Sequence, residues 1–111
     1  MAVNSPQYGI VLVTVASLAQ GETIAQVLLA EKLAACVNLL PVDSWYWWEN
    51  KINRDREYQL LIKTKLSLFS QVREQIKTLH NYEVPEIIAI PIVAGSQSYL
   101  NWLDDNTIRH D

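Results

Sequence analysis

The sequence predicts an α+β fold in which one antiparallel sheet carries two helices on one face. Runs rich in β-branched residues alternate with stretches whose apolar residues recur every three or four positions. A polar segment with turn residues separates the second β-rich run from the third, which indicates a hairpin. The elements therefore follow the order strand, helix, strand, strand, helix, strand.

The first strand and the first helix occupy the amino-terminal third of the chain. The run YGIVLVTVA, beginning at Tyr8, is almost wholly apolar, as is typical of a central strand covered on both faces. Residues 17–23 are polar and include Gly21, and an apolar stripe with helical spacing then runs from Ile24 to Leu33. We expect the first helix to begin near the start of this stripe.

The second strand is unusually long. The segment AACVNLLPVDSWYWW favours β structure from about Ala35 to Trp48, and Pro41, which lacks a ladder N–H, indicates a bulge, a bend or a sheet edge. The polar residues 49–55 are interpreted as the turn of a long hairpin, after which REYQLLIKTK resumes strand character.

The second half of the chain supplies a helix, a strand and a short terminal helix. Ser67 is the predicted N-cap of a helix that ends near His80, and its apolar stripe comprises Phe69, Val72, Ile76 and Leu79. EIIAIPIVAG predicts the fourth strand, in which Pro91 marks an edge, an end or a bulge. A short helix is expected over residues 97–106, with Asp104 and Asp105 as polar residues at its end and His110 in a solvated tail.

This order, β-α-β-β-α-β plus a short C-terminal helix, is that of the split βαβ or ferredoxin-like fold. No linker, repeat or low-complexity segment divides the chain. We therefore expect a single domain over residues 1–111, with an ordered core over about residues 7–106.

The length of the second strand predicts association with other copies of the chain. About fourteen extended residues span roughly 46 Å, whereas a compact domain of this size is roughly 34 Å across. Either Pro41 bends the strand sharply or the hairpin projects, and a projecting hairpin leaves Trp45, Tyr46, Trp47 and Trp48 short of cover. The alternative is that these aromatic side chains pack beneath the helices of their own chain. We favour a homo-oligomer held by the hairpin, with the strand near Pro91 as a second docking edge.

Composition excludes several classes of partner. The 111 residues are 50% hydrophobic and 19% charged, and the net charge of -3 with no basic stripe argues against nucleic acid and anionic membranes. The single cysteine, Cys36, cannot form an internal disulfide, and the first residues lack the pattern of a secretory signal. We expect a cytoplasmic protein with no membrane-spanning segment.

Five segments together resemble the CutA family of divalent-cation tolerance proteins. They are EKLAACVN at residues 31–38, WYWWENK at 45–51, LLIKT at 60–64, HNYEVPEIIAIPI at 80–92 and GSQSYLNWL at 95–103. The resemblance implies a ferredoxin-like fold related to the PII signalling proteins, a homotrimer, and an association with tolerance of copper and other divalent metals. Two departures stand out: Asn81 replaces the proline common after this histidine, and the residue before Thr14 is not the cysteine of some bacterial relatives.

The candidate metal ligands are His80, Glu86 and Cys36. Imidazole, carboxylate and thiolate together suit copper or another divalent cation, bound as a ligand rather than as a required cofactor. Glu83 could join His80, whereas a lone cysteine such as Cys36, between a helix end and an apolar strand, is more often a small buried apolar residue. A threefold axis or a subunit cleft could gather ligands that the spacing along one chain does not.

A second hypothesis describes a PII-like signalling or scaffold trimer that binds a small ligand or a partner protein and has no metal role. The family match suggests a cleft between subunits, lined by Trp48, Lys63, Tyr82 and Glu86. We expect no enzymatic activity, because the sequence shows no nucleophile with a nearby base and no glycine-rich phosphate loop, with only 3 glycines in the chain.

Overall fold

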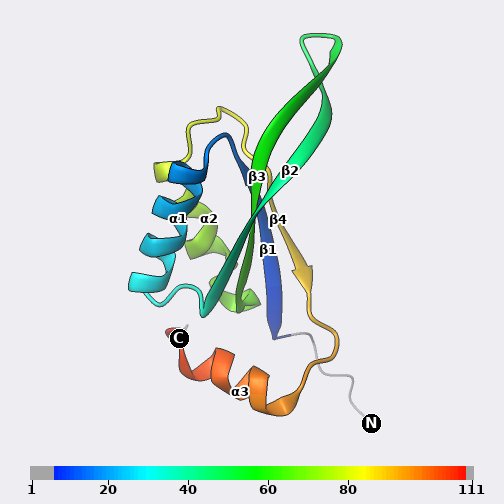
Figure 1. Ribbon diagram of the computed structural model, residues 1–111. Helices are drawn as coiled ribbons and strands as arrows, with labels where there is room; N and C mark the ends of the chain where they lie inside the picture. The colour runs from blue at the N-terminus through cyan, green and yellow to red at the C-terminus, as the bar shows by residue number, and fades with distance from the viewer. Residues whose placement is uncertain (1–6, 110–111) are drawn as a thin grey trace.

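The computed structural model describes residues 7–109 and confirms the predicted order of strands and helices (Figure 1). The sheet has the strand order β2-β3-β1-β4, and every neighbouring pair is antiparallel, as in the ferredoxin-like fold. The elements are β1 (Tyr8–Val15), α1 (Leu18–Ala30), β2 (Cys36–Trp48), β3 (Lys51–Lys65), a 3-10 turn (Leu66–Leu68), α2 (Phe69–Leu79), β4 (Ile87–Pro91) and α3 (Gln97–Asp105). His110 lies outside the described residues.

The core lies between the sheet and the two helices on one of its faces. Both α1 and α2 lie on one face of the sheet (Figure 1). In β1, Val11, Val13 and Val15 are fully buried, because alternate side chains of a strand lie on the same face. The other fully buried apolar side chains of this core come from the helices, from β3 and from the 3-10 turn: Ile24, Leu28, Leu60, Ile62, Leu68, Val72 and Ile76. β1 is thus a central strand, as its apolar run predicts.

The hairpin of β2 and β3 projects past the helices instead of bending back (Figure 1). Its two strands pair without a break from Cys36 opposite Lys63 to Trp48 opposite Lys51. The molecule is accordingly elongated, at 49 × 32 × 23 Å with a radius of gyration of 15.0 Å. Pro41 interrupts nothing, because β2 is an edge strand, where proline is tolerated. Pro91 likewise ends β4, the opposite edge of the sheet.

The turn of the hairpin is shorter than residues 49–55, which the sequence suggests. Only Glu49 and Asn50 form it, and both have positive φ angles, of 51° and 61°. Two successive left-handed residues match the twist of the flanking strands, so the polar residues from Lys51 onward can pair with β2. The Asn53 side chain reinforces the turn by donating to the carbonyl oxygens of Trp48 (3.2 Å) and Lys51 (3.1 Å).

Both helices begin at residues other than those the sequence suggests. α1 starts six residues before Ile24 because the hydroxyl of Ser17 caps it, accepting from the Gln20 N–H at 3.2 Å. It ends at Ala30, since Lys32 has a φ of 56° and turns the chain toward β2. Ser67 is not an N-cap: it lies within the 3-10 turn, and α2 begins at Phe69 without a side-chain cap.

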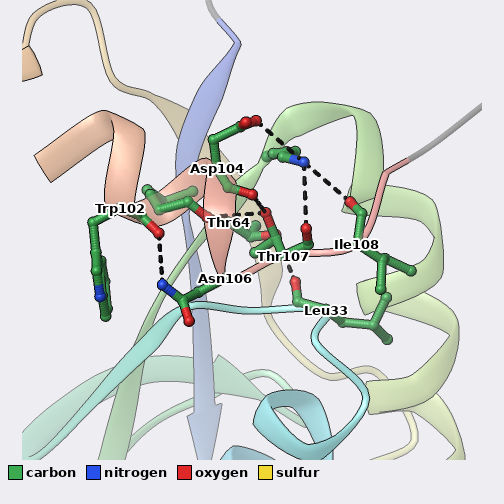
Figure 2. Close-up of polar contacts among 9 residues, drawn as sticks. Leu33, Thr64, Trp102, Asp104, Asn106, Thr107 and Ile108 are labelled. Atoms are coloured by element: carbon green, nitrogen blue, oxygen red, sulfur yellow. Dashed lines mark hydrogen bonds and ion pairs between the residues drawn. The ribbon is translucent and has the colours of Figure 1, made fainter. Parts of the chain in front are cut away.

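Helix α3 lies at the end of the sheet away from the hairpin tip (Figure 1). Lys65, the last residue of β3, holds it there. The buried Lys65 ammonium lies 3.2 Å from Asp104 Oδ1 and donates to the carbonyl oxygens of Thr107 (3.5 Å) and Ile108 (3.1 Å). Figure 2 shows these three acceptors around the ammonium nitrogen. Nearby, the Thr64 hydroxyl donates a hydrogen bond to the Leu33 carbonyl oxygen at 2.6 Å. Asp104 therefore anchors the C-terminal segment instead of simply ending the helix in solvent.

Candidate functional site

Neither α1 nor α2 covers the opposite face of the sheet, which we call the open face; among the described residues, the loop before β4 reaches this face at Glu57. Because Val11 pairs with Ile62 on the helix side, the next residues along, Leu12 and Leu61, pair on the open side, beside Ile88 of β4. Ile88 is 51% exposed and Ile90 is 47% exposed. The alternation places six large apolar residues on this face: Ile10, Leu12, Leu40, Leu61, Ile88 and Ile90.

The aromatic residues of the hairpin extend this uncovered apolar surface. Trp45, Tyr46, Trp47 and Trp48 are 63%, 38%, 71% and 55% exposed, so they do not pack beneath the helices of their own chain. Alternation puts Tyr46 and Trp48 on the side that continues the open face, and Trp45 and Trp47 on the other. The Arg54 guanidinium lies 5.0 Å from the centre of the Trp45 ring. Whether these residues form an interface between copies stays a prediction.

His80, the C-cap of α2, begins a loop that runs over residues 80–86 to β4. Its Nε2 lies 2.7 Å from the carbonyl oxygen of Thr14, which can only accept, so Nε2 carries the ring proton. The N–H of Tyr82 donates to the other ring nitrogen, Nδ1, at 3.0 Å. The two rings lie against each other with centroids 4.9 Å apart. Both nitrogens of His80 are thus engaged within the chain.

Tyr82 closes over a buried carboxylate, that of Glu57. The Tyr82 hydroxyl donates to Glu57 Oε2 at 2.5 Å, and Glu57 is only 5% exposed. Burial, followed by the hydrogen bond to Glu57, raises the pKa of Tyr82 well above its ordinary value. Glu57 is not among the predicted site residues. Strand periodicity places it on the open side with Gln59, but its burial depends on the loop that crosses it.

The three candidate metal ligands do not come together within one chain. His80 and Glu86 both lie at the Val15 end of β1, since His80 binds Thr14 and the residue after Glu86 pairs with Val13. Cys36 pairs with Lys63 of β3, and Lys63 lies four residues beyond the β3 partner of Thr14. Cys36 is therefore about 13 Å along the sheet from the end that carries His80. Among residues 7–109, no three His, Cys, Asp or Glu side chains are grouped to hold an ion. One chain therefore does not fit a divalent cation at these residues.

The four residues proposed to line a cleft are also spread along the sheet of a single chain. Trp48 lies opposite Lys51 at the hairpin tip, whereas Lys63 lies twelve residues along β3, about 40 Å away. Tyr82 and Glu57 lie between them. A cleft that includes both Trp48 and Lys63 would need side chains from more than one copy.

A shallow hollow of about 410 Å³ lies on the helix side of the molecule. Its lining is polar and mixed, and none of its residues is among the predicted site residues: Glu31, Leu33, Gln71, Glu74, Gln75, Thr78 and Ile108. The hollow is therefore separate from the open face. Over residues 7–109, no helix has both the length and the apolar composition to cross a bilayer.

Comparison with known proteins gives a consistent result over nearly the whole chain. The family model of the CutA1 divalent ion tolerance protein matches residues 9–106. The divalent-cation tolerance protein CutA of Archaeoglobus fulgidus is 42% identical over 98 residues, which is 88% of this chain and 96% of that protein. Protein CutA 1, chloroplastic, of Oryza sativa is 46% identical over 99 residues, and the match spans 56% of the rice protein.

Solved structures agree with the sequence matches. The crystal structure of CutA1 from Oryza sativa superposes with a TM-score of 0.91 at 43% identity, covering 96% of this chain and 98% of the rice chain. The Cut A1 protein of Thermus thermophilus gives a TM-score of 0.87 at 46% identity, covering 90% and 98% of the two chains. The chain therefore belongs to the CutA1 divalent ion tolerance family.

Proposed function

We propose that this chain acts as a homotrimer in the response to divalent cations and binds the ion where subunits meet. The open face carries the proposal. Its apolar side chains continue into the exposed Tyr46 and Trp48, and Trp45 and Trp47 are exposed on the other side of the hairpin. Monomers usually leave no more than a few hundred Å² of contiguous apolar surface in water, so a surface of this kind favours association. Other copies of the chain can cover it, with residues 45–48 and the edge at Pro91 as contacts. The number three comes from the family.

The assembly is tested by light scattering of the full chain. We expect about three times the chain mass of 12.7 kDa at micromolar concentration. A mass equal to that of one chain would contradict the proposal, since the open face would then remain in water.

Within the assembly, one chain contributes His80 and Glu86 as the proposed ligands. A neighbouring chain contributes the Cys36 thiolate. Imidazole, carboxylate and thiolate donors suit Cu²⁺ or Zn²⁺. Copper or another divalent cation is the proposed ligand, and the fold requires no cofactor. The family's name, divalent ion tolerance, supports this choice.

Calorimetric titration with Cu²⁺ and Zn²⁺ tests the site. We expect saturable binding that His80→Ala removes and that His110→Ala, a change at the chain's other histidine, leaves in place. Binding lost through His110→Ala instead would move the site to the C-terminal histidine. Absence of saturable binding to the trimer would remove the metal role.

The second candidate is a PII-like trimer that binds a small ligand in a cleft between subunits and has no metal role. It is favoured by Lys63, which is half-buried on the open face and forms no ion pair with any residue from Gln7 to Arg109. An unpaired ammonium in partly apolar surroundings attracts an anionic group. Thermal stabilisation by inorganic phosphate, lost in Lys63→Met but kept in Lys77→Met, would support this candidate, and its absence would count against it.

The proposal includes no catalysed reaction and places the protein in the cytoplasm. The single cysteine is typical of a reducing compartment. Relatives occupy other compartments by name, since the rice protein is called chloroplastic and the Archaeoglobus fulgidus structure is called periplasmic. Imaging of a C-terminally tagged full-length protein tests the location.

A further inference from the structure

His80 cannot bind a metal ion in the conformation that the structure describes. A metal takes the lone pair of one imidazole nitrogen, and both nitrogens already have a partner. Nε2 donates its proton to the Thr14 carbonyl at 2.7 Å, and the lone pair of Nδ1 accepts the Tyr82 N–H at 3.0 Å. The proposed ligand is therefore occupied by its own chain.

Both routes to a metal complex break the same hydrogen bond. Binding through Nδ1 displaces the Tyr82 N–H directly. Binding through Nε2 requires the ring proton to move to Nδ1, where it would face the Tyr82 N–H, donor against donor. In either case the Tyr82 N–H and the His80 ring must separate, and where the ring keeps its place beside Thr14 it is the backbone at Tyr82 that moves.

The Tyr82 side chain opposes that movement. Its hydroxyl is tied to Glu57 Oε2 at 2.5 Å, and its ring lies against that of His80, with centroids 4.9 Å apart. Lifting Tyr82 would break the one hydrogen bond that the described residues supply to the Glu57 carboxylate, and would open this 5%-exposed group to water. The cost of lifting is therefore the net free energy of a hydrogen bond to a charged group, because water replaces the phenol as the donor.

We propose that residues 80–82 and Glu57 form a latch, which holds His80 away from metal until the loop over residues 80–86 lifts. The proposal rests on metal binding by His80, as argued above. Tyr82 and Glu57 are positioning residues, because neither is proposed to touch the ion. The latch makes the Tyr82–Glu57 bond and metal binding at His80 mutually exclusive, so each weakens the other.

Titration with Zn²⁺ and Cu²⁺ of the full-length Tyr82→Phe variant tests the coupling. The variant keeps the ring against His80 but removes the bond to Glu57, so we expect binding about threefold to tenfold tighter than in the wild type. Glu57→Gln keeps a weaker, uncharged acceptor and should fall between the two. Tyr8→Phe is the control, because Tyr8 lies at the opposite end of β1 from Thr14 and its hydroxyl makes no hydrogen bond within residues 7–109. Its affinity should equal that of the wild type.

The outcomes separate the latch from the metal role. Binding that needs His80 but is equal or weaker in Tyr82→Phe would overturn the latch and leave the metal role intact. Absence of binding in the wild type with binding through His80 in Tyr82→Phe would support the latch. Absence of binding in both proteins would overturn the metal role, and with it the latch as a control of metal binding.

A measurement without metal tests the latch by itself. The ¹⁵N shifts of the His80 ring in the metal-free protein should report a protonated Nε2 and an unprotonated Nδ1, and the reverse tautomer would overturn the proposal. Amide exchange at residue 82 should be about threefold to tenfold faster in Tyr82→Phe than in the wild type or Tyr8→Phe. Equal exchange in all three proteins would show that Glu57 does not hold the loop closed.

Discussion

The ammonium of Lys65 lies 3.2 Å from Oδ1 of Asp104, in an ion pair whose lysine side chain is only 10% exposed. The pair joins the last residue of β3 to the last turn of α3, and it lies next to the hydrogen bonds from the same ammonium to the backbone of Thr107 and Ile108. One side chain thus fixes the C-terminal segment to the sheet.

Lys65→Met should destabilise the chain by about 2–4 kcal/mol, because it leaves Asp104 and two carbonyl groups without their donor. Urea unfolding at one fixed protein concentration measures the change. Lys77→Met is the matched control: Lys77 is exposed on α2, and its replacement should change stability by less than about 0.5 kcal/mol. Equal effects of the two changes would show that the Lys65 contacts contribute little.

Trp47→Asp and Trp48→Asp should each weaken assembly. These side chains are 71% and 55% exposed in one chain. A carboxylate buried at an interface without a partner lowers the stability of the assembly by about 2–5 kcal/mol. Light scattering over a dilution series should show dissociation at higher concentration than in the wild type. Leu29→Asp, at a residue 41% exposed on α1, is the control and should leave the mass unchanged. Unchanged mass and melting temperature in both tryptophan variants would contradict the predicted interface.

The contribution of Tyr82 to stability should decrease in alkali. Burial and the bond to Glu57 raise the pKa of Tyr82 in the folded chain above the ordinary value of 10.0. A raised folded-state pKa stabilises the fold below the ordinary pKa, and the contribution is lost as the pH rises through the folded-state pKa. The stability difference between the wild type and Tyr82→Phe, measured by urea unfolding, should therefore shrink from pH 8 to about pH 11. An undiminished difference would contradict this assignment.

Gly9→Ala should destabilise the sheet by about 1–3 kcal/mol. A Cβ at Gly9 would lie 2.5 Å from Leu66 Cδ2 and 3.0 Å from the carbonyl oxygen of Ile90, and the backbone atom cannot move aside cheaply. Gly95→Ala is the control, since its Cβ would meet only the Leu100 side chain, at 3.1 Å, and should leave stability nearly unchanged or slightly higher. A loss from Gly9→Ala no larger than that from Gly95→Ala, in chemical unfolding, would refute the packing argument.

The features that could be predicted from the sequence are those that depend on local pattern and length. The apolar run of β1 and the helical stripe of α2 predict burial directly, because the spacing of the apolar residues matches the period of the strand or the helix. Comparing the length of a strand that ends at Trp48 with the diameter of a compact domain left two alternatives, a sharp bend at Pro41 or a projecting hairpin, and the structure has the second. Both arguments use only distances along the chain.

The features that could not be predicted join distant parts of the chain. Glu57 is buried because Tyr82, 25 residues away, covers it, and Lys65 meets Asp104 only after α3 has folded back onto β3. Strand alternation gives the side of the sheet on which a residue lies but not which loop crosses it. The occupied nitrogens of His80 belong to the same class, since the Thr14 carbonyl lies 66 residues before the ring it contacts.

The two-residue turn at Glu49 and Asn50 has a consequence for the evolution of this surface. The turn sets the pairing register of the whole hairpin, and side chains alternate with a period of two. A single residue inserted between Trp48 and the turn would therefore shift β2 by one position relative to β3. The side chains of β2 would then change sides of the hairpin, so each indole ring would lie on the side opposite to its present one. A point substitution changes one side chain of this surface, whereas an insertion at the tip would change the side on which every side chain of the strand lies. The length of the turn should therefore be under stronger selection than its composition.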